Sequence, residues 1–453
     1  MPTAPSERLN RGAELVFESS IPAVRHRGRP LLLVGLGVAG FVLLLLRVPP
    51  SSWNVPLIED SVVFLGGAYS PDPGVIVAPY AGYLQLPLRL VAELVRLFPV
   101  GIAAAVIAVA SGAVAALLGV ALYLFMERRI RSLPLRLLGW LAFVVMPLAG
   151  SEMALTLADV QWYLLIAAFW AASVTAATRT VYAVQVVVVT AAVLNNPLAL
   201  LVIPVIVARI VLLRGGRREL ALPILFGAAA VAQIAVVVVT ALTAHQRPDT
   251  GVARPGLGQF VDFYAGQVAL PTLGGVRIST ALVARMPTTI AGLALGLLIA
   301  ALVYLVVRCP PHRRIAVGGF AVASVAFMAV VALLEWKRLS ATSVFDFFSS
   351  GRYAAVGVAL LLGALLLGFD GLQRARRWER WTSLAVAAVI VVVPAILDYR
   401  TVDLRAGIRT WDAAVEDAAA VCADGRASAV VESAAPAWWP VPATVPCAVL
   451  LGR

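Results

Sequence analysis

The residues best suited to chemistry in this sequence are two adjacent carboxylates, Glu59 and Asp60, in the stretch WNVPLIEDSVVF. Their neighbours on both sides are apolar, so a charge here is costly unless it is paired or used. A carboxylate whose pKa is raised by partial desolvation can take a proton from a hydroxyl as a general base. The plain alternative is a solvated loop pair or a charge at the start of a helix.

Several basic side chains are placed where they could bind an anion such as a phosphate. Arg352, together with Lys337 or Arg338, flanks the segment LSATSVFDFFSSGRY, and Arg89 lies in LPLRLVAELVRLF. In the second stretch, leucines recur at helical spacing opposite the charges, which predicts an amphipathic helix on a membrane surface. The alternative for Arg89 is a solvated charge whose stem covers apolar surface.

Signals for metals and cofactors are weak. The three histidines, His26, His245 and His312, lie in separate segments and never at i, i+4 spacing. A divalent cation held by Glu59, Asp60 and a phosphate is the one metal site that we consider. We find no Walker loop, GxSxG elbow or Rossmann fingerprint in a suitable context, so the sequence does not indicate ATP hydrolysis, serine hydrolysis or nicotinamide binding.

The elements that must position these residues are membrane helices. Of the 453 residues, 61% are hydrophobic and only 13% are charged, a balance that is not typical of a soluble domain. The sequence predicts an all-α polytopic membrane protein with about eleven transmembrane helices, within a range of 10–12. The predicted spans are 30–47, 100–125, 137–150, 160–177, 181–194, 198–213, 220–243, 287–307, 315–334, 353–369 and 382–397. Three of them, 137–150, 181–194 and 198–213, are short and would need tilt, local thinning of the bilayer or a hairpin buried among other helices.

The distribution of charge predicts the orientation. With the N-terminus inside, the internal segments hold 21 of the 36 basic residues and seven of the 24 acidic ones, as the positive-inside rule favours. We therefore expect a cytoplasmic tail at 1–29 and a transmembrane domain at 30–397 with external loops 48–99 and 244–286. The use of arginine at all basic positions but one suggests a bacterial plasma membrane. The net charge of +12 is spread in short clusters between apolar runs, which does not indicate nucleic-acid binding.

The last part of the chain, 398–453, is predicted to be a small external α/β segment. It contains RTWDAAVEDAAAVC and then a stretch rich in Trp and Pro that ends in VPCAVLLGR, which predicts a helix followed by one or two short strands. Cys422 and Cys447 both lie in it, outside the cytosol, where a disulfide can persist. The alternative is two unpaired cysteines. Cys309, in the internal loop RCPPHRR, is expected to be a reduced thiol.

The acidic pair in the first external segment, the amphipathic helix after it and the number of spans resemble the GT-C superfamily of membrane glycosyltransferases. The stretches PYAGYLQLPLRLVAEL and DVQWYLL are also similar to segments of bacterial members of that superfamily. The resemblance covers the first half of the chain better than the second. It implies a GT-C-like fold and an inverting transfer of sugar from a polyprenyl-phosphate donor, on the outer face of the membrane, to a glycan, glycolipid or protein acceptor of the cell envelope.

The resemblance also implies roles for residues. By position, the catalytic acid of the family corresponds to Asp60 or Glu59, with Asp60 slightly favoured. The donor phosphate would be bound by Arg352 with Lys337 or Arg338, or by Arg89. Sugar sites combine aromatic faces with amide and carboxylate groups. The external side offers these for sugar or acceptor binding: Tyr80, Tyr83, Glu152, Gln161, Trp162 and Tyr353. For the aromatic residues the alternative is the belt of Trp and Tyr that marks any membrane interface.

Other functions remain open at this point. A transporter or a flippase for lipid-linked glycans would bury ionisable groups near the middle of its spans and break helices there, and the predicted spans carry almost no charge at that depth. A glycan polymerase or ligase would use its own large external loop. A non-catalytic envelope assembly subunit would use the external tail to bind a partner.

Overall fold

The computed structural model describes residues 12–13, 16–17, 28–146, 148, 150–213, 217–243, 254–341, 351–372, 377–400, 403–436 and 442–452. Most of these residues lie in helices, and the one sheet that they form has two short strands near the C-terminus. The predicted predominance of helix is confirmed. Helices suit an apolar chain in a bilayer, because they satisfy every backbone hydrogen bond within the segment.

Seven helices in the described ranges are long and apolar enough to cross a membrane. They are α2 (Arg29–Arg47), α5 (Ala103–Met126), α11 (Ala221–Thr243), α14 (Pro287–Arg308), α15 (Pro311–Ala341), α16 (Gly351–Gly371) and α17 (Arg377–Leu397). Both α14 and α15 begin at a proline, which is tolerated in a first turn because its missing N–H needs no partner there. The chain is therefore a multi-pass membrane protein.

The remaining predicted spans are also helices, but shorter ones. They are α6 (Leu133–Val145), α8 (Val160–Ser173), α9 (Arg179–Asn195), and the 3-10 helix η7 (Pro197–Val202) continued by α10 (Ile203–Leu212). A full crossing at right angles needs about 20 residues, so these helices reach across only with tilt, with their flanking turns or in a thinned bilayer. The predicted ends at 150 and 177 are too late, because the backbone leaves the helix at Met146 and at Val174.

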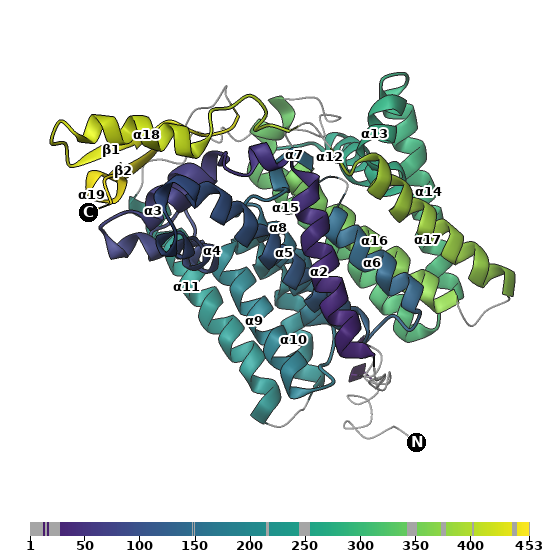
Figure 1. Cartoon of the computed structure of the whole chain (residues 1–453). Coiled ribbons are helices and arrows are strands. Elements are labelled where there is room, and N and C mark those ends of the chain that lie inside the picture. The colour runs from purple at the N-terminus through teal and green to yellow at the C-terminus, as the bar shows by residue number, and fades with distance from the viewer. Residues whose placement is uncertain are drawn as a thin grey trace.

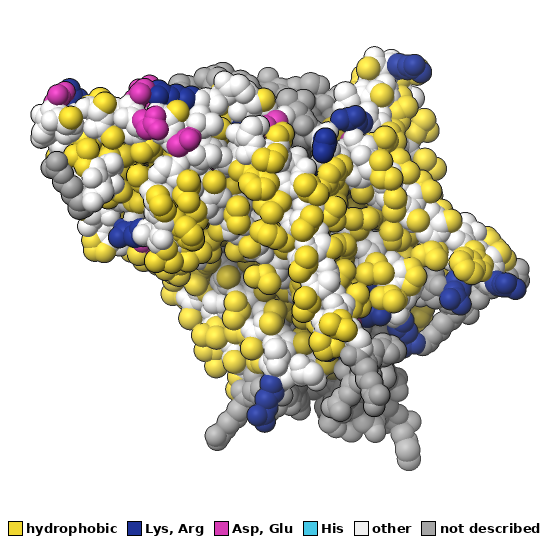
Figure 2. Space-filling view, viewed as in Figure 1, with side chains coloured by type: hydrophobic (Ala, Val, Ile, Leu, Met, Phe, Trp, Pro, Cys, Tyr) yellow, Lys and Arg dark blue, Asp and Glu magenta, His cyan; other side chains and the backbone are white. Residues whose placement is uncertain are grey.

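The helices form a bundle with two distinct ends, which we name after the first and last residues of α2. At the Arg29 end, Arg29 forms an ion pair of 2.7 Å with Glu127, just after α5. At the Arg47 end, the guanidinium of Arg47 donates a hydrogen bond of 2.6 Å to the carbonyl of Val145, the last residue of α6. Figure 1 shows the start of α2 at the lower end of the bundle and the C-terminal segment at the upper end. In Figure 2, hydrophobic side chains cover the flanks between these ends, as a lipid-facing surface requires.

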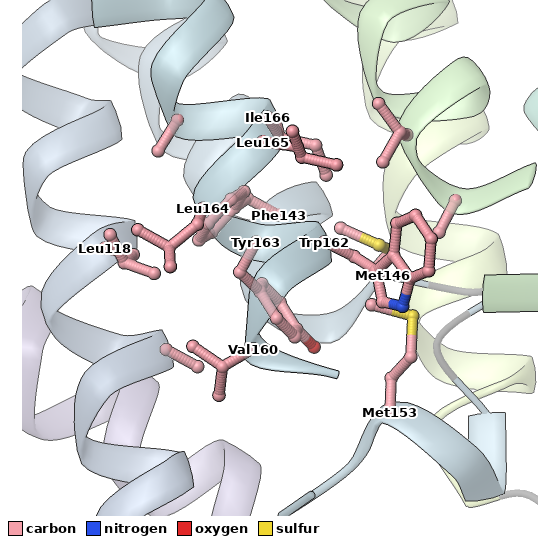
Figure 3. Packing of buried hydrophobic residues seen from close by; sticks show 14 of the residues in the cluster. Leu118, Phe143, Met146, Met153, Val160, Trp162, Tyr163, Leu164, Leu165 and Ile166 are labelled. Carbon is pink, nitrogen blue, oxygen red and sulfur yellow. The ribbon is translucent and has the colours of Figure 1, made fainter. Parts of the chain in front are cut away.

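The core of the bundle lies around α8 and α16. Every residue of α8 is buried, and so are most residues of α16. Figure 3 shows side chains of α8, among them Tyr163 and Leu164, packed with those of its neighbours. The ring of Tyr163 meets Phe143 of α6 edge-on at 5.2 Å. Because α8 is surrounded by protein, its ends are held firmly, and one of these ends carries residues of the candidate site.

Shorter elements cover the Arg47 end, where the sequence predicts external loops. The first external segment contains η1 (Pro50–Ser52), the π-helix η2 (Asp60–Leu65), α3 (Gly66–Ala68), η3 (Pro73–Val77), α4 (Leu86–Ala92), η4 (Glu93–Leu97) and η5 (Val100–Ile102). A four-residue helix, α7 (Gly150–Met153), precedes α8, and η8 (Arg217–Leu220) precedes α11 at the opposite end. The predicted amphipathic helix is α4 with η4, and its leucines Leu90, Leu94 and Leu97 are exposed.

The second predicted external loop is also helical where it is described. From residue 254 onward it folds as α12 (Leu257–Tyr264), the π-helix η9 (Ala265–Ala269) and α13 (Leu270–Val283), with η9 completely buried. A kink divides α13 at Gly275, whose φ of 70° favours glycine. The carboxylate of Asp398, just after α17, accepts the N–H groups of Val276 and Arg277 beyond the kink, at 2.7 and 3.0 Å. These contacts make the described part of the segment a packed part of the fold.

The C-terminal segment contains α18 (Trp411–Cys422), β1 (Ser428–Val431), β2 (Ala443–Pro446) and α19 (Cys447–Leu450). The two strands are antiparallel, with Ser428 opposite Pro446 and Val431 opposite Ala443. A disulfide joins Cys422 at the end of α18 to Cys447 at the start of α19. Cys309, at the Arg29 end, is a buried free thiol.

Trp411 fastens the C-terminal segment to the first external segment. Its backbone N–H donates to the carbonyl of Asn54 at 2.7 Å, and its buried indole donates to the carbonyl of Val100 at 2.8 Å. The backbone N–H of Ala435 adds a third bond, of 2.9 Å, to the carbonyl of Pro56. The last part of the chain is therefore anchored on the segment that carries Glu59 and Asp60.

Candidate functional site

Arg352, in the first turn of α16, lies between two glutamates at the Arg47 end. Its guanidinium nitrogens are 3.6 Å from a carboxylate oxygen of Glu59 and 3.9 Å from one of Glu152. Glu59 directly precedes η2 and Glu152 lies in α7, so three segments far apart in the sequence meet here. The side chains of Arg352, Glu59 and Glu152 are 13, 22 and 25% exposed, so none of the three is completely buried.

Aromatic rings border this ion-pair cluster. The guanidinium carbon of Arg352 lies 5.3 Å from the ring centre of Tyr353, and that ring meets Trp162 of α8 edge-on, also at 5.3 Å. Burial raises the pKa of the Tyr83 hydroxyl. Tyr353 and Arg352 are both close enough for their charges to act on that pKa as well. A cation beside aromatic faces suits a ligand that joins an anionic group to a ring of hydroxyls.

Asp159, a residue that the sequence analysis missed, is buried beside the cluster at the start of α8. Its carboxylate accepts a hydrogen bond of 2.8 Å from the indole of Trp162. Burial raises the pKa of Asp159 to about 8, while the positive charge of Arg352 opposes that rise. Near neutral pH this carboxyl is therefore mostly protonated. The only signal for it in the sequence is an aspartate three residues before a tryptophan at the start of an apolar helix.

Asp60 is turned away from Arg352, although it follows Glu59 directly. Its two carboxylate oxygens accept the backbone N–H groups of Leu157, at 3.2 Å, and Ala158, at 3.1 Å. The side chain is buried, and burial raises the pKa of Asp60 to about 7. Of the two adjacent carboxylates, Glu59 faces the cluster and Asp60 holds the loop between α7 and α8.

Arg405, from the C-terminal segment, holds the same loop from its other side. The side chain is buried, and burial lowers the pKa of Arg405, an effect that the nearby carboxylate of Asp60 opposes. Its Nε donates to the carbonyl of Val55 at 3.0 Å. Its Nη2 contacts three acceptors in the loop, the carbonyls of Ala154 and Leu155 at 3.1 and 3.3 Å and the hydroxyl of Thr156 at 2.9 Å.

Residues 154–158 are thus bound on both sides, by Arg405 through their carbonyls and by Asp60 through their N–H groups. This loop connects Glu152 to Asp159, two of the acidic residues that lie near Arg352. Asp60 and Arg405 therefore control the positions of both carboxyl groups without touching the guanidinium that these groups face. Sequence reasoning missed Arg405, because nothing distinguishes it from the other arginines of the C-terminal segment.

Arg89, a candidate for phosphate binding, has a different contact. It is buried on the inner face of α4, and its Nη1 donates to the carbonyl of Val63 in η2 at 3.3 Å. A buried guanidinium bonded to a helix carbonyl stabilises η2. It is not solvated on the outer face of its helix, as the plain alternative supposed.

The other candidates lie around the cluster or away from it. Tyr80 pairs with Tyr83 through two backbone hydrogen bonds of 2.9 and 3.1 Å, so it shapes the turn that carries Tyr83. The amide oxygen of Gln161 accepts a hydrogen bond of 2.8 Å from Asn196. Lys337 is exposed on α15, and the side chain of Arg338 lies outside the described residues.

A cation site at this cluster finds little support among the described side chains, which contain no group of three or more His, Cys, Asp or Glu arranged to hold a metal ion. Asp60 is occupied by backbone N–H groups, so only Glu59 of the pair faces the cluster. A divalent cation here would need oxygen ligands from a bound phosphate.

Chemically, the cluster offers one cation, Arg352, which two partly exposed carboxylates share. A buried neutral acid, Asp159, and two aromatic rings lie beside it. An incoming anion would compete with Glu59 and Glu152 for Arg352. In comparisons with known proteins, no family model, curated protein or solved structure matches this chain.

Proposed function

We propose that the chain is a membrane glycosyltransferase that moves a sugar from a polyprenyl-phosphate carrier to a hydroxyl of a glycan, glycolipid or protein of the cell envelope. The observation that carries this proposal is the position of Arg352 between Glu59 and Glu152, beside Trp162 and Tyr353. The arginine supplies the charge that a phosphate needs, and the partly exposed ring of Tyr353 supplies a face for a sugar. The resemblance to the GT-C superfamily supports the same assignment.

The proposed reaction begins when the phosphate of the donor binds Arg352 and displaces Glu59 from its ion pair. The freed carboxylate of Glu59 accepts the proton of the acceptor hydroxyl, while the oxygen of that hydroxyl bonds to the anomeric carbon of the sugar. The bond between that carbon and the phosphate oxygen breaks at the same time. Its electron pair stays on the polyprenyl phosphate, whose charge Arg352 stabilises, and the sugar is transferred with inversion.

We assign the general base to Glu59 and a positioning role to Asp60. The sequence slightly favoured Asp60 as the base, but both of its oxygens accept backbone hydrogen bonds and its side chain is buried. A general base must come within hydrogen-bond distance of the hydroxyl that it deprotonates. Glu59 is partly exposed and close to Arg352, so it meets that requirement better.

We further propose that all eleven apolar helical segments cross the plasma membrane, with the Arg29 end in the cytoplasm and the Arg47 end outside. Eleven crossings put the start of α2 and the C-terminal segment on opposite faces, in keeping with their places at opposite ends of the bundle. The excess of arginine in the segments of the Arg29 end supports the same orientation. The candidate site then faces the side on which polyprenyl-linked sugars are used.

The transporter alternative is less well supported by the described helices. In the seven long helices, charged side chains lie within about two turns of a helix end. Ion-coupled transporters carry such groups near the middle of the membrane and break their helices there. The cluster around Arg352 lies instead at one end of the bundle, where an enzyme acting on lipid-linked substrates would need it.

The test is transfer of radiolabelled sugar by the full-length protein in liposomes that contain a panel of polyprenyl-phosphate sugars and an envelope glycolipid extract. Glu59→Gln should lower the transfer rate by about 10²-fold or more, the usual contribution of a general base, while donor binding persists. Glu93→Gln is the matched control, because Glu93 is paired with Arg96 at 2.7 Å at the same end of the bundle but outside the cluster.

Arg352→Lys separates the two proposed roles. The lysine keeps the charge but loses the planar fork of donors, so we expect weaker donor binding with Glu59 still able to act. Folded wild type that transfers sugar from none of the donors would refute the proposed activity. Glu59→Gln as active as Glu93→Gln would refute the assignment of the base alone.

A further inference from the structure

A second polar site lies at the Arg29 end, far from the cluster around Arg352. Here a cavity of about 340 Å³ opens between the starts of α6, α15 and α17 and the end of α16. Its polar lining includes Arg131, His312, Arg313, Asp370 and Arg380. The 24 residues of α5, at about 1.5 Å of rise each, separate the two ends of the bundle by roughly 35 Å. The cavity is therefore independent of the proposed sugar-transfer site.

The single carboxylate in this cavity is already neutralised. One oxygen of Asp370 accepts the backbone N–H groups of Arg131, at 3.0 Å, and Ser132, at 2.9 Å. The other oxygen is 2.8 Å from the guanidinium of Arg313, and both side chains are buried. Asp370 thus fixes the wall of the cavity and has no capacity left to balance another cation.

Two further arginines line the cavity and are exposed. Neither Arg131 nor Arg380 has an ion pair with a carboxylate among the described residues. Three helices, α6, α15 and α17, also begin here, and the positive ends of their helix dipoles favour anions. Arginine side chains and helix starts together create a strongly electropositive cavity. Its chemistry suits the oxygens of a phosphate.

The residues around the cavity are of the kinds found at a membrane interface. Trp378 and Trp381, in the first turns of α17, are 58 and 57% exposed, as tryptophans at the boundary between headgroups and acyl chains are. The guanidinium carbon of Arg380 is 6.0 Å from the ring centre of Trp381, and Leu133 at the rim is also exposed. A phosphate bound here would have apolar surface beside it for attached acyl chains.

From these observations we propose that the cavity binds the phosphate headgroup of an anionic phospholipid, held by Arg131 and Arg380. A zwitterionic phospholipid brings a cationic group next to its phosphate, which these arginines and helix starts disfavour. Basic pockets between membrane helices are known to select anionic headgroups in this way. The site would couple the bundle to the lipid composition of the leaflet that surrounds its Arg29 end.

The experiment is native mass spectrometry of the full-length protein in detergent, titrated with phosphatidylglycerol or with phosphatidylcholine of the same acyl chains. Wild type should retain one phosphatidylglycerol in preference to phosphatidylcholine. Arg131→Gln and Arg380→Gln should each weaken that binding about fivefold, the factor expected for one basic side chain near an anionic headgroup. Arg179→Gln is the matched control, because Arg179 is an exposed arginine at the start of α9, at the same end but outside the cavity.

Three results would overturn the proposal. Equal retention of the two lipids by wild type would show that the headgroup charge is not recognised. An equal loss in Arg179→Gln would show a diffuse effect of charge. Displacement of phosphatidylglycerol by excess inorganic phosphate would identify a site for a free anion. Intrinsic fluorescence melts confirm that each variant is folded, and sugar transfer assayed on the same samples keeps this outcome separate from the proposed catalysis.

Discussion

Asp159 should make the stability of this protein depend on pH. Burial raises the pKa of Asp159 from its ordinary value of 3.8 to about 8, so the folded protein favours the protonated form. Folded protein therefore binds one more proton than unfolded protein between these two values. The stability that this carboxyl contributes is fully present below pH 3.8 and is lost as the pH rises to about 8.

The size of the effect follows from the linkage between proton binding and folding. One group that binds a proton only in the folded state changes the free energy of unfolding by about 1.4 kcal/mol per pH unit. Between pH 6 and pH 8, Asp159 should thus cost the wild type about 2 kcal/mol. Asp159→Asn removes the titration, and its amide oxygen can still accept the hydrogen bond from Trp162. The variant should therefore gain about 2 kcal/mol on the wild type over this range.

The assay is unfolding in mild detergent followed by tryptophan fluorescence at pH 6, 7 and 8, for wild type and Asp159→Asn. Asp424→Asn serves as the control, because Asp424 is exposed in the C-terminal segment. Differences between variants isolate Asp159 from other groups that titrate in the same range. If Asp159→Asn keeps the pH dependence of the wild type, the carboxyl is ionised in the folded protein and the reasoning about its burial is wrong.

Three further predictions concern stability. Arg405→Met should destabilise the protein by about 3 kcal/mol in the same unfolding assay, because the carbonyls of a buried loop lose their hydrogen-bond donor. Arg409→Met, at an exposed ion pair, is the control and should change the stability little. Gly275→Ala should lower the stability by about 2 kcal/mol or more, because the added Cβ would lie 2.2 Å from an oxygen of Asp398. Gly292→Ala, in open space on a helix, is the control and should be neutral or stabilising; thermal melts measure both variants. Reduction of the disulfide, which closes a loop of 25 residues, should cost about 3 kcal/mol and speed proteolysis of the C-terminal segment; an unchanged rate would contradict this.

The sequence predicts the positions of the helices well, because the bilayer imposes a simple rule on length and polarity. Helices occur at every predicted span, but several ends are displaced by a few residues: α6 and α8 end early, α15 continues to Ala341 and α17 begins at Arg377. Exact ends depend on local features such as the break after Val145, which hydropathy does not encode. Whether the four shorter helices cross the bilayer remains a prediction, since length alone does not decide it.

The candidate site is predictable in part. The residue types and their positions relative to the ends of the predicted spans were enough to select Glu59, Glu152 and Arg352. The structure brings these three residues together. The sequence does not predict that Glu59 faces Arg352 while Asp60 bonds the loop between α7 and α8. Neighbouring residues on a helix point about 100° apart, so either carboxylate could have faced Arg352. The contribution of Arg405 depends on contacts with residues about 250 positions earlier, and nothing local marks such a contact.

The bond network of Arg405 has a consequence for biosynthesis. The loop that carries Glu152 and Asp159 emerges from the ribosome early, but its carbonyls find their donor only in a residue that follows α17. A nascent chain can therefore insert all its helices while this loop is still unbraced. The cluster around Arg352 reaches its final shape only after translation has passed Arg405 and the C-terminal segment has docked.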